Sequence, residues 1–247
     1  MQTHNLQQGS SEWNEFRANH FGASEAAAML GLSKDLTRND LLLYKKTGKS
    51  KEYGSWAQKN ILDYGHEVEA LARAIVEQEI SDELYPVTCS LGKLSASLDG
   101  LTLDGGTAWE HKQWNEGLVN YIVDNGTVPD THMPQCQQIL LITAAEELIF
   151  TVSDGTDNKR ISCAIRPDKS WFDRIQSGWN QFKNDLETFE PKELAEKPKA
   201  AAIMQLPALS IQIKGEVTVS NLPQFKAAAE SFIANISTEL KTDEDFV

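Results

Sequence analysis

The segment that most constrains how this chain folds runs from Ser97 to Lys112 and reads SLDGLTLDGGTAWEHK. It begins with a short alternation of apolar and polar residues. Asp104-Gly105-Gly106 follows as a strong turn signal, because glycine readily adopts the positive φ that tight hairpins need. Residues 107–112 then have the pattern of a returning strand. The segment therefore predicts a β-hairpin.

Three charged side chains of this hairpin are expected to meet. Side chains two residues apart on a strand share a face, so Glu110 and Lys112 point the same way. Closing the hairpin brings Asp99 near them. A purely structural interpretation is a surface hairpin with an ordinary salt bridge. The motif is short and its residues are common, so it could occur without any functional site.

The alternative interpretation is a metal-dependent phosphodiester hydrolase. Asp and Glu supply the hard oxygen ligands that Mg²⁺ prefers, and the ion keeps several waters and binds phosphate oxygens. A bound metal acidifies water and screens the charge that develops on the phosphate. A lysine beside it can orient or deprotonate that water, or stabilise the transition state as a cation.

Four short blocks occur together in one order along the chain, and they give it a resemblance to a known family. It resembles the phage-type alkaline exonucleases, the lambda exonuclease or YqaJ-like group of the PD-(D/E)XK nuclease superfamily, over roughly Gln8 to Pro191. The blocks are Glu12-Trp13-x-x-x-Arg17 with Gly22-Ala23-Ser24; Gly65-x-x-x-Glu69; Ser97-Leu98-Asp99-Gly100 with Glu110-His111-Lys112; and Gln135-Cys136-Gln137.

The resemblance implies an α/β (α+β) fold, a restriction-endonuclease-like core in which helices flank a mixed β-sheet. It also implies a catalytic centre. Asp99, Glu110 and the main-chain carbonyl of His111 would hold Mg²⁺, with Mn²⁺ as a possible substitute and two ions per site. Lys112 would activate water, and Glu69 and Gln135 would support the site.

A second implied group binds the 5′-phosphate of the DNA end. Arg17 would grip the phosphate, a task that suits a guanidinium fork, and Ser24 and Ser97 would assist. Each has a plainer local role, as a solvated helix arginine, a helix N-cap and a small strand residue. Two positions depart from the family pattern: Leu98 replaces a proline, and His132 replaces a tyrosine.

The implied activity is digestion of duplex DNA from a 5′ end, leaving a 3′ single strand. The resemblance also implies a ring-shaped homotrimer and a phage-type single-strand annealing protein as partner. Two other functions stay open, a PD-(D/E)XK endonuclease or nickase and a non-catalytic DNA-end-binding recombination scaffold. A requirement for a free DNA end separates the first from an exonuclease, and metal-dependent turnover excludes the second.

Composition limits these possibilities without deciding among them. The formal net charge of −13 argues against a protein that coats DNA, since neutralising phosphates needs Lys and Arg. A local basic channel would still fit. We expect no membrane span and no signal peptide, and three reduced cysteines, Cys89, Cys136 and Cys163, in the cytoplasm of a bacterial or phage-infected cell.

The chain divides by composition into a nuclease domain (1–191), a linker (192–207) and a C-terminal β-α segment (208–247), mobile or an incomplete domain. Within the first part we expect helices near 55–78, with a possible break at Gly65, and from Pro134 to about Glu147. Ser24 is a candidate N-cap. The aromatic residues of 170–189 should pack in the core or at a subunit interface. The lysines of 45–51 are interpreted as a solvated loop rather than as a DNA contact.

Overall fold

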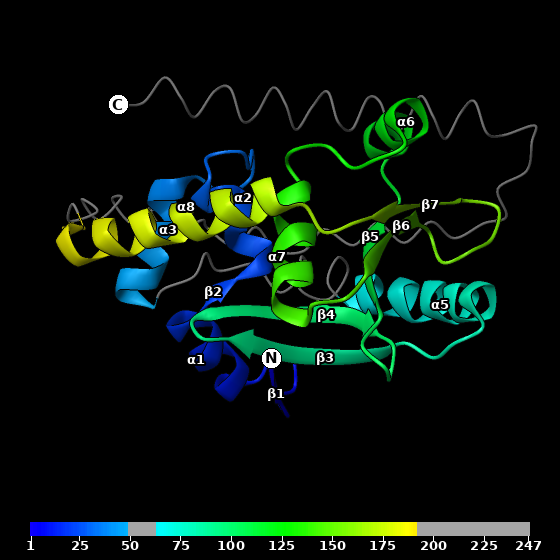
Figure 1. Cartoon of the computed structure of the whole chain (residues 1–247), viewed down its shortest axis with the longest axis horizontal. Helices are drawn as coiled ribbons and strands as arrows, with labels where there is room; N and C mark the ends of the chain where they lie inside the picture. Colours follow the sequence, from blue (N-terminus) through cyan, green and yellow to red (C-terminus); the bar gives the residue numbers. More distant parts are fainter. Residues whose placement is uncertain (49–62, 192–247) are drawn as a thin grey trace, which may run out of the picture. The chain divides into compact units, whose positions relative to one another are not determined.

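The predicted hairpin forms the centre of a mixed sheet. The computed structural model describes residues 1–48 and 63–191 (Figure 1). In it β4 (Leu94–Leu101) and β5 (Thr107–Gln113) are antiparallel. The turn between them has Gly105 at φ +77° and a bond from Gly106 N–H to Asp104 Oδ1 of 2.8 Å. The turn chemistry read from the sequence is confirmed.

Within the described residues, one seven-stranded sheet has the order β1-β3-β4-β5-β6-β7, and β2 pairs with β4. The β5–β6 and β2–β4 pairs are parallel, and the other pairs are antiparallel. The remaining strands are β1 (Gln2–His4), β2 (Phe21–Gly22), β3 (Tyr85–Leu91), β6 (Glu147–Ser153) and β7 (Arg160–Ile165). The expected mixed sheet is therefore present.

Helices cover both faces of the sheet (Figure 1). They are α1 (Ser11–Asn19), the 3₁₀ turn η1 (Ala23–Glu25), α2 (Ala26–Met29), α3 (Arg38–Thr47), α5 (Asp63–Ile80), α6 (Glu116–Asn125), α7 (Met133–Thr143) and α8 (Lys169–Thr188). Among the described helices, none is both long and apolar enough to span a membrane.

Strand alternation explains why helices lie on both faces. Along β5, Ala108 faces a core cluster shared with α7, whereas Trp109 faces a cluster shared with Ala72 and Val76 of α5. A third cluster joins α2 and α3 to Ile175, Trp179 and Phe182 of α8. The prediction that the aromatic residues of this helix pack in the core is confirmed for Trp179 and Phe182.

Three local predictions need correction. Ser24 is not an N-cap, because Gly22 precedes η1 and the Glu25 carboxylate accepts the Gly22 N–H at 2.9 Å. The helix from Pro134 stops at Thr143, where Ala144 turns left-handed so that Glu147 can begin β6. Finally, α5 continues through Gly65 without a break.

Some predictions fall on residues that the structure does not describe. They are the start of the helix expected at 55–78, the linker at 192–207 and the C-terminal segment at 208–247.

Candidate active site

The candidate site lies where the pairing between β4 and β5 ends. The two strands pair at Gly100↔Trp109 and Leu101↔Ala108. One residue before the paired region, Asp99 accepts the backbone N–H of His111 through Oδ2 at 2.8 Å. A side-chain carboxylate thus replaces a backbone acceptor at the end of the ladder. This contact brings Asp99 to the Glu110-His111-Lys112 segment, as the sequence predicted.

Glu110 and Lys112 share a face of β5 and contact each other. Lys112 Nζ donates to Glu110 Oε1 at 2.6 Å, and Gln135 Nε2 of α7 donates to the same oxygen at 2.6 Å. The side chain of Glu110 is buried. Its other oxygen, Oε2, is also buried and has no hydrogen-bond partner among the described residues. An orphaned buried carboxylate oxygen is costly unless it has a ligand.

Glu69 reaches the site from α5. Arg73, one turn later, donates to Glu69 Oε1 at 2.5 Å and, through Nε, to the main-chain oxygen of Asp99 at 3.0 Å. Glu69 is half-buried and the neighbouring Glu67 is exposed. Sequence reasoning did not single out Arg73. The i,i+4 spacing from Glu69 signals an ion pair, but nothing local signals the bond to Asp99.

Burial and mutual repulsion shift the acid–base properties of these groups. Burial, together with the charge of Glu69, raises the pKa of Asp99 to about 6. Burial raises the pKa of Glu110 to about 7, although the Lys112 ammonium opposes this shift. Burial acts to lower the pKa of Lys112, but the carboxylates of Glu110 and Asp99 outweigh it and raise that pKa. Two acidic side chains with raised pKa values therefore lie close together in the site.

The side chains of this site could bind a hard divalent ion, but they are too few to hold one by themselves. Asp99 and Glu110 offer carboxylate oxygens, of which Glu110 Oε2 lacks a partner. Within residues 1–48 and 63–191, no three His, Cys, Asp or Glu side chains gather closely enough to hold a metal by themselves. An ion here would therefore need main-chain oxygen or water besides the two carboxylates, a coordination that suits Mg²⁺.

Two of the three predicted phosphate ligands, Arg17 and Ser97, are linked through Trp13. Arg17 stacks its guanidinium over the Trp13 ring, 4.7 Å from the ring centroid. Trp13 Nε1 in turn donates to Ser97 Oγ at 3.2 Å, and Ser97 precedes Asp99 by two residues on the same face of β4. Ser24 is exposed in η1. The structure thus links Arg17 to Ser97 and to the strand that carries Asp99.

His132, in place of the family tyrosine, is not simply solvated. It is half-buried, with Nδ1 2.9 Å from Thr131 Oγ1 and its ring edge against Phe150. Burial lowers the pKa of His132 to about 4, so the ring is neutral near pH 7. His111 is neutral for the same main reason: burial lowers its pKa to about 4, and Nε2 lies 2.9 Å from Ser153 Oγ.

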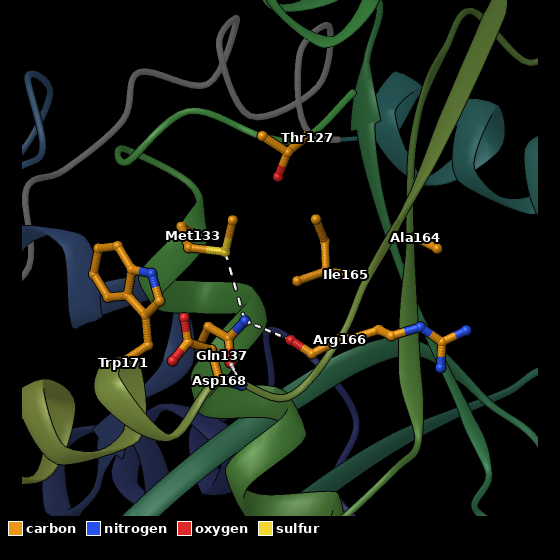
Figure 2. Close-up of a pocket in the computed structure, with 8 residues that line it drawn as sticks. All are labelled: Thr127, Met133, Gln137, Ala164, Ile165, Arg166, Asp168 and Trp171. Atoms are coloured by element: carbon orange, nitrogen blue, oxygen red, sulfur yellow. Dashed lines mark hydrogen bonds between the residues drawn. The ribbon is translucent and has the colours of Figure 1, made fainter. Parts of the chain in front are cut away.

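The second glutamine of the Gln-x-Gln motif points away from the carboxylates. Gln137 lines a separate pocket of about 190 Å³ with Met133, Asp168 and Trp171 (Figure 2). Its Nε2 donates to Arg166 O at 2.9 Å, and its Oε1 accepts from Asp168 N at 3.0 Å. Gln137 therefore joins α7 to the start of α8, and only Gln135 of this motif contacts the site.

Two further residues contact Arg17: Glu25, which sequence reasoning missed, and Lys45, which it misinterpreted. Lys45 lies in α3, where its side chain is buried and 2.7 Å from the buried Glu25 carboxylate. The solvated-loop interpretation is therefore wrong for Lys45, because tertiary packing buries it. Lys49 and Lys51 lie outside the described residues.

Comparison with known proteins finds similar folds. No curated protein matches the chain significantly. An alkaline exonuclease, LHK-Exo, from Laribacter hongkongensis is similar in structure, with TM-score 0.60 and 20% identity over 72% of this chain and 93% of that chain. A phage-related exonuclease from Haemophilus somnus 129PT has TM-score 0.53 and 12% identity, over 71% and 97%. These likenesses show the fold.

The family is shown by a sequence model. A model described as the YqaJ-like viral recombinase domain matches residues 12–146. That range begins just before Trp13 and Arg17 and ends after Gln135, so it contains every site residue that the sequence predicted. The chain belongs to the YqaJ-like viral recombinase domain family.

Proposed function

We propose that this protein is a Mg²⁺-dependent exonuclease that digests one strand of duplex DNA from its 5′ end and leaves a 3′ single strand. The observation that carries this proposal is the convergence of Asp99, Glu110 and Lys112, with one buried Glu110 oxygen lacking a partner. The similar structures described as exonucleases support it, and one of them, LHK-Exo, has been determined in complex with dAMP.

Asp99, Glu110 and the main-chain carbonyl of His111 are the proposed ligands of Mg²⁺, with two ions per site and Mn²⁺ as a substitute. When bound, the metal would acidify water and screen phosphate charge. Gln135 holds Glu110 Oε1 from α7, and Arg73 holds Glu69 from within α5. These contacts fix both acidic side chains before substrate arrives.

The chemistry proposed is hydrolysis of the bond between phosphorus and the 3′-oxygen of the terminal nucleotide. The oxygen of a water molecule bonds to phosphorus, and the electron pair of the broken bond stays on the 3′-oxygen, which takes up a proton. Lys112, beside Glu110, orients the water and opposes the charge on the phosphate. The released nucleotide keeps its own 5′ group, and the shortened strand has a new 5′-phosphate.

Recognition of the end is assigned to Arg17, Ser24 and Ser97. The new 5′-phosphate left by each cut is then the group that these residues bind in the next cycle. A homotrimer, a single-strand annealing partner and action in the cytosol of a bacterial or phage-infected cell complete the proposal. Sedimentation at about three times the chain mass would support the trimer.

Digestion of a linear duplex tests the function directly. The duplex is labelled at one strand's 5′ or 3′ end and compared with a closed circle, in Mg²⁺ and in EDTA. Mg²⁺-dependent loss of the 5′ label first, with the circle intact, is the expected result. Cutting of the circle would indicate an endonuclease instead, and retained DNA binding without cleavage would indicate a scaffold.

A further inference from the structure

A buried ion pair lies directly beneath Arg17. Lys45 of α3 and Glu25 of η1 are separated by 2.7 Å, and their side chains are 1% and 4% exposed. Lysine and glutamate are almost never buried so completely unless they are paired, because desolvating either charge is costly. Burial acts to lower the pKa of Lys45, and the Glu25 carboxylate opposes that shift. The presence of both charges in the interior therefore calls for an explanation in terms of what Lys45 and Glu25 contact.

Lys45 also fixes the end of α1 on which Arg17 lies. Its Nζ donates to the main-chain oxygens of Arg17 and His20, each at 2.6 Å. Together with Glu25 these acceptors use all three protons of the ammonium group. The last carbonyls of a helix lack intrahelical donors, and a lysine is a suitable partner for them. Lys45 thereby anchors the backbone of Arg17 to α3.

Glu25 contacts the guanidinium group of the same arginine, whereas Lys45 contacts its backbone. Its Oε1 accepts from Arg17 Nη2 at 3.3 Å, while Oε2 accepts from Lys45 and from the Gly22 backbone. The shorter contact of the carboxylate is with Lys45. The Arg17 side chain remains 31% exposed and rests on the Trp13 ring.

The charges of this cluster do not cancel. Two cations meet one carboxylate, and the enclosed cation, Lys45, makes the closer contact. The remaining positive charge therefore lies on the exposed cation, Arg17. Without Lys45, the carboxylate of Glu25 would be left to Arg17 alone and would compete with any phosphate for its guanidinium.

We propose that Lys45 determines the specificity for 5′-phosphorylated ends: it neutralises buried Glu25, so that Arg17 keeps an uncompensated charge aimed at the terminal phosphate. Lys45 acts through Arg17 and is a positioning residue, with no contact to substrate of its own. The inference rests on the proposed function, because it assumes that Arg17 binds the DNA end. It adds the reason why the charge of Arg17 is available to a phosphate: Lys45 neutralises the nearby Glu25 carboxylate.

The test measures release of the first nucleotide only, because every later cut starts from a 5′-phosphate. Two duplexes are identical except for a 5′-phosphate or a 5′-hydroxyl, with a fluorescent label on the terminal base. Lys45→Met is compared with wild type and with Lys46→Met. Lys46 is the matched control, since it is the next residue, is exposed and contacts Leu186 O and Glu187 O instead.

Wild type should prefer the phosphorylated end. Lys45→Met should reduce that preference by roughly tenfold, the size of one charge-assisted hydrogen bond. The loss should appear in KM for phosphorylated ends, with kcat and cleavage of hydroxyl ends unchanged. The double variant Lys45→Met/Glu25→Gln removes both buried charges and should recover most of the preference. Lys46→Met should behave as wild type.

Retention of the wild-type preference by Lys45→Met would overturn the inference. So would a double variant that loses as much as the single one, because Lys45 would then act only through structure. If Lys45→Met does not fold, the double variant decides the question: the inference stands if the preference is kept and fails if it is lost.

A binding measurement separates this inference from the proposed exonuclease activity. Fluorescence anisotropy in EDTA compares the affinities of the same two duplexes for each variant without cleavage. A preference for the phosphate that depends on Lys45 would support the inference even if no DNA were digested. Equal affinities of the two ends for wild type would overturn it, even if the exonuclease reaction were observed.

Discussion

Glu110 is the residue on which the other groups of the candidate site converge. One of its oxygens receives both Lys112 and Gln135, and the other is buried without a partner among the described residues. If that oxygen binds a divalent ion, the ionised form of Glu110 is the functional one. Two predictions at the scale of the single residue follow from its charge.

Replacing Glu110 by glutamine keeps the size of the side chain and removes its charge. Mg²⁺ affinity in Glu110→Gln should fall by about tenfold or more, and nucleotide release by about 100-fold, because electrostatic stabilisation of the reacting phosphate is lost. Calorimetry and the labelled-duplex assay measure the two effects. Glu116→Gln, a change at an exposed residue of α6, is the control. Unchanged Mg²⁺ affinity would remove Glu110 from the ligand set.

The raised pKa of Glu110, about 7, predicts a pH dependence of metal binding. Below that pH a proton occupies the carboxylate and competes with the ion, and above it the carboxylate is ionised. Mg²⁺ affinity should therefore increase from pH 6 to pH 8 and change little beyond. Calorimetric titration at these values tests the sign, and Glu110→Gln should show a weaker dependence. An affinity that falls as pH rises would contradict the assignment.

At the scale of the element, Gln138 joins α7 to three neighbours. It is fully buried, and its Nε2 donates to Phe21 O at 2.7 Å and Ser95 O at 3.2 Å. Its Oε1 accepts from Trp179 Nε1 at 2.7 Å. One amide therefore holds β2, β4 and α8 against the helix that presents Gln135 to the site.

Gln138→Leu should destabilise the protein by about 3 kcal/mol, since each buried polar group left without a partner costs about 1–3 kcal/mol. Urea unfolding followed by circular dichroism measures the loss. Gln176→Leu, at an exposed position of α8, should change the free energy of unfolding by less than about 0.5 kcal/mol. Equal stability of the two variants would show that the buried amide contributes nothing.

Elements marked by local signals could be predicted from the sequence. The β4–β5 hairpin follows from Asp104-Gly105-Gly106, and α8 follows from aromatic residues at helical spacing. The end of α7 could not be predicted, because nothing local forbids helix at Ala144. It is the pairing of β6 with β5, a contact distant in sequence, that requires the chain to leave the helix there.

The residues of the candidate site also fall into those that the sequence could predict and those that only the tertiary fold reveals. Glu110 and Lys112 are two residues apart, so strand geometry alone placed them together, and the resemblance supplied Glu69 and Gln135. Arg73 and Lys45 escaped because the bond from Arg73 to the Asp99 main chain and the pair of Lys45 with Glu25 are fixed by packing between separate elements. Lys45 stands among other lysines, where composition favours solvent, and only the tertiary fold buries it against Glu25.

At the scale of the whole molecule, charge and domain extent are the features to explain. A net charge of −13 opposes DNA binding, yet charges farther than a Debye length of about 8 Å are largely screened at physiological salt. In the proposed function, local groups such as Arg17 therefore decide contact with a DNA end. The extent of the nuclease domain is a separate question, and deletion can answer it.

The last prediction concerns a chain that ends at Pro191. Ile175, Trp179 and Phe182 of α8 complete the buried cluster with α2 and α3, so the cut must follow α8. Residues 1–191 should fold, unfold at nearly the same temperature as the full chain and release nucleotides within about twofold of its rate, since the buried clusters of the described residues all lie within 1–191.

The matched control for this deletion is residues 1–168, which lack α8. Removing Trp179 and Phe182 costs about 3–5 kcal/mol for each large side chain lost from a core, which exceeds the stability of many domains. This shorter chain should not fold, as judged by circular dichroism. If residues 1–191 also fail to fold or to cleave, the C-terminal residues belong to the nuclease itself, and the boundary at Pro191 is wrong.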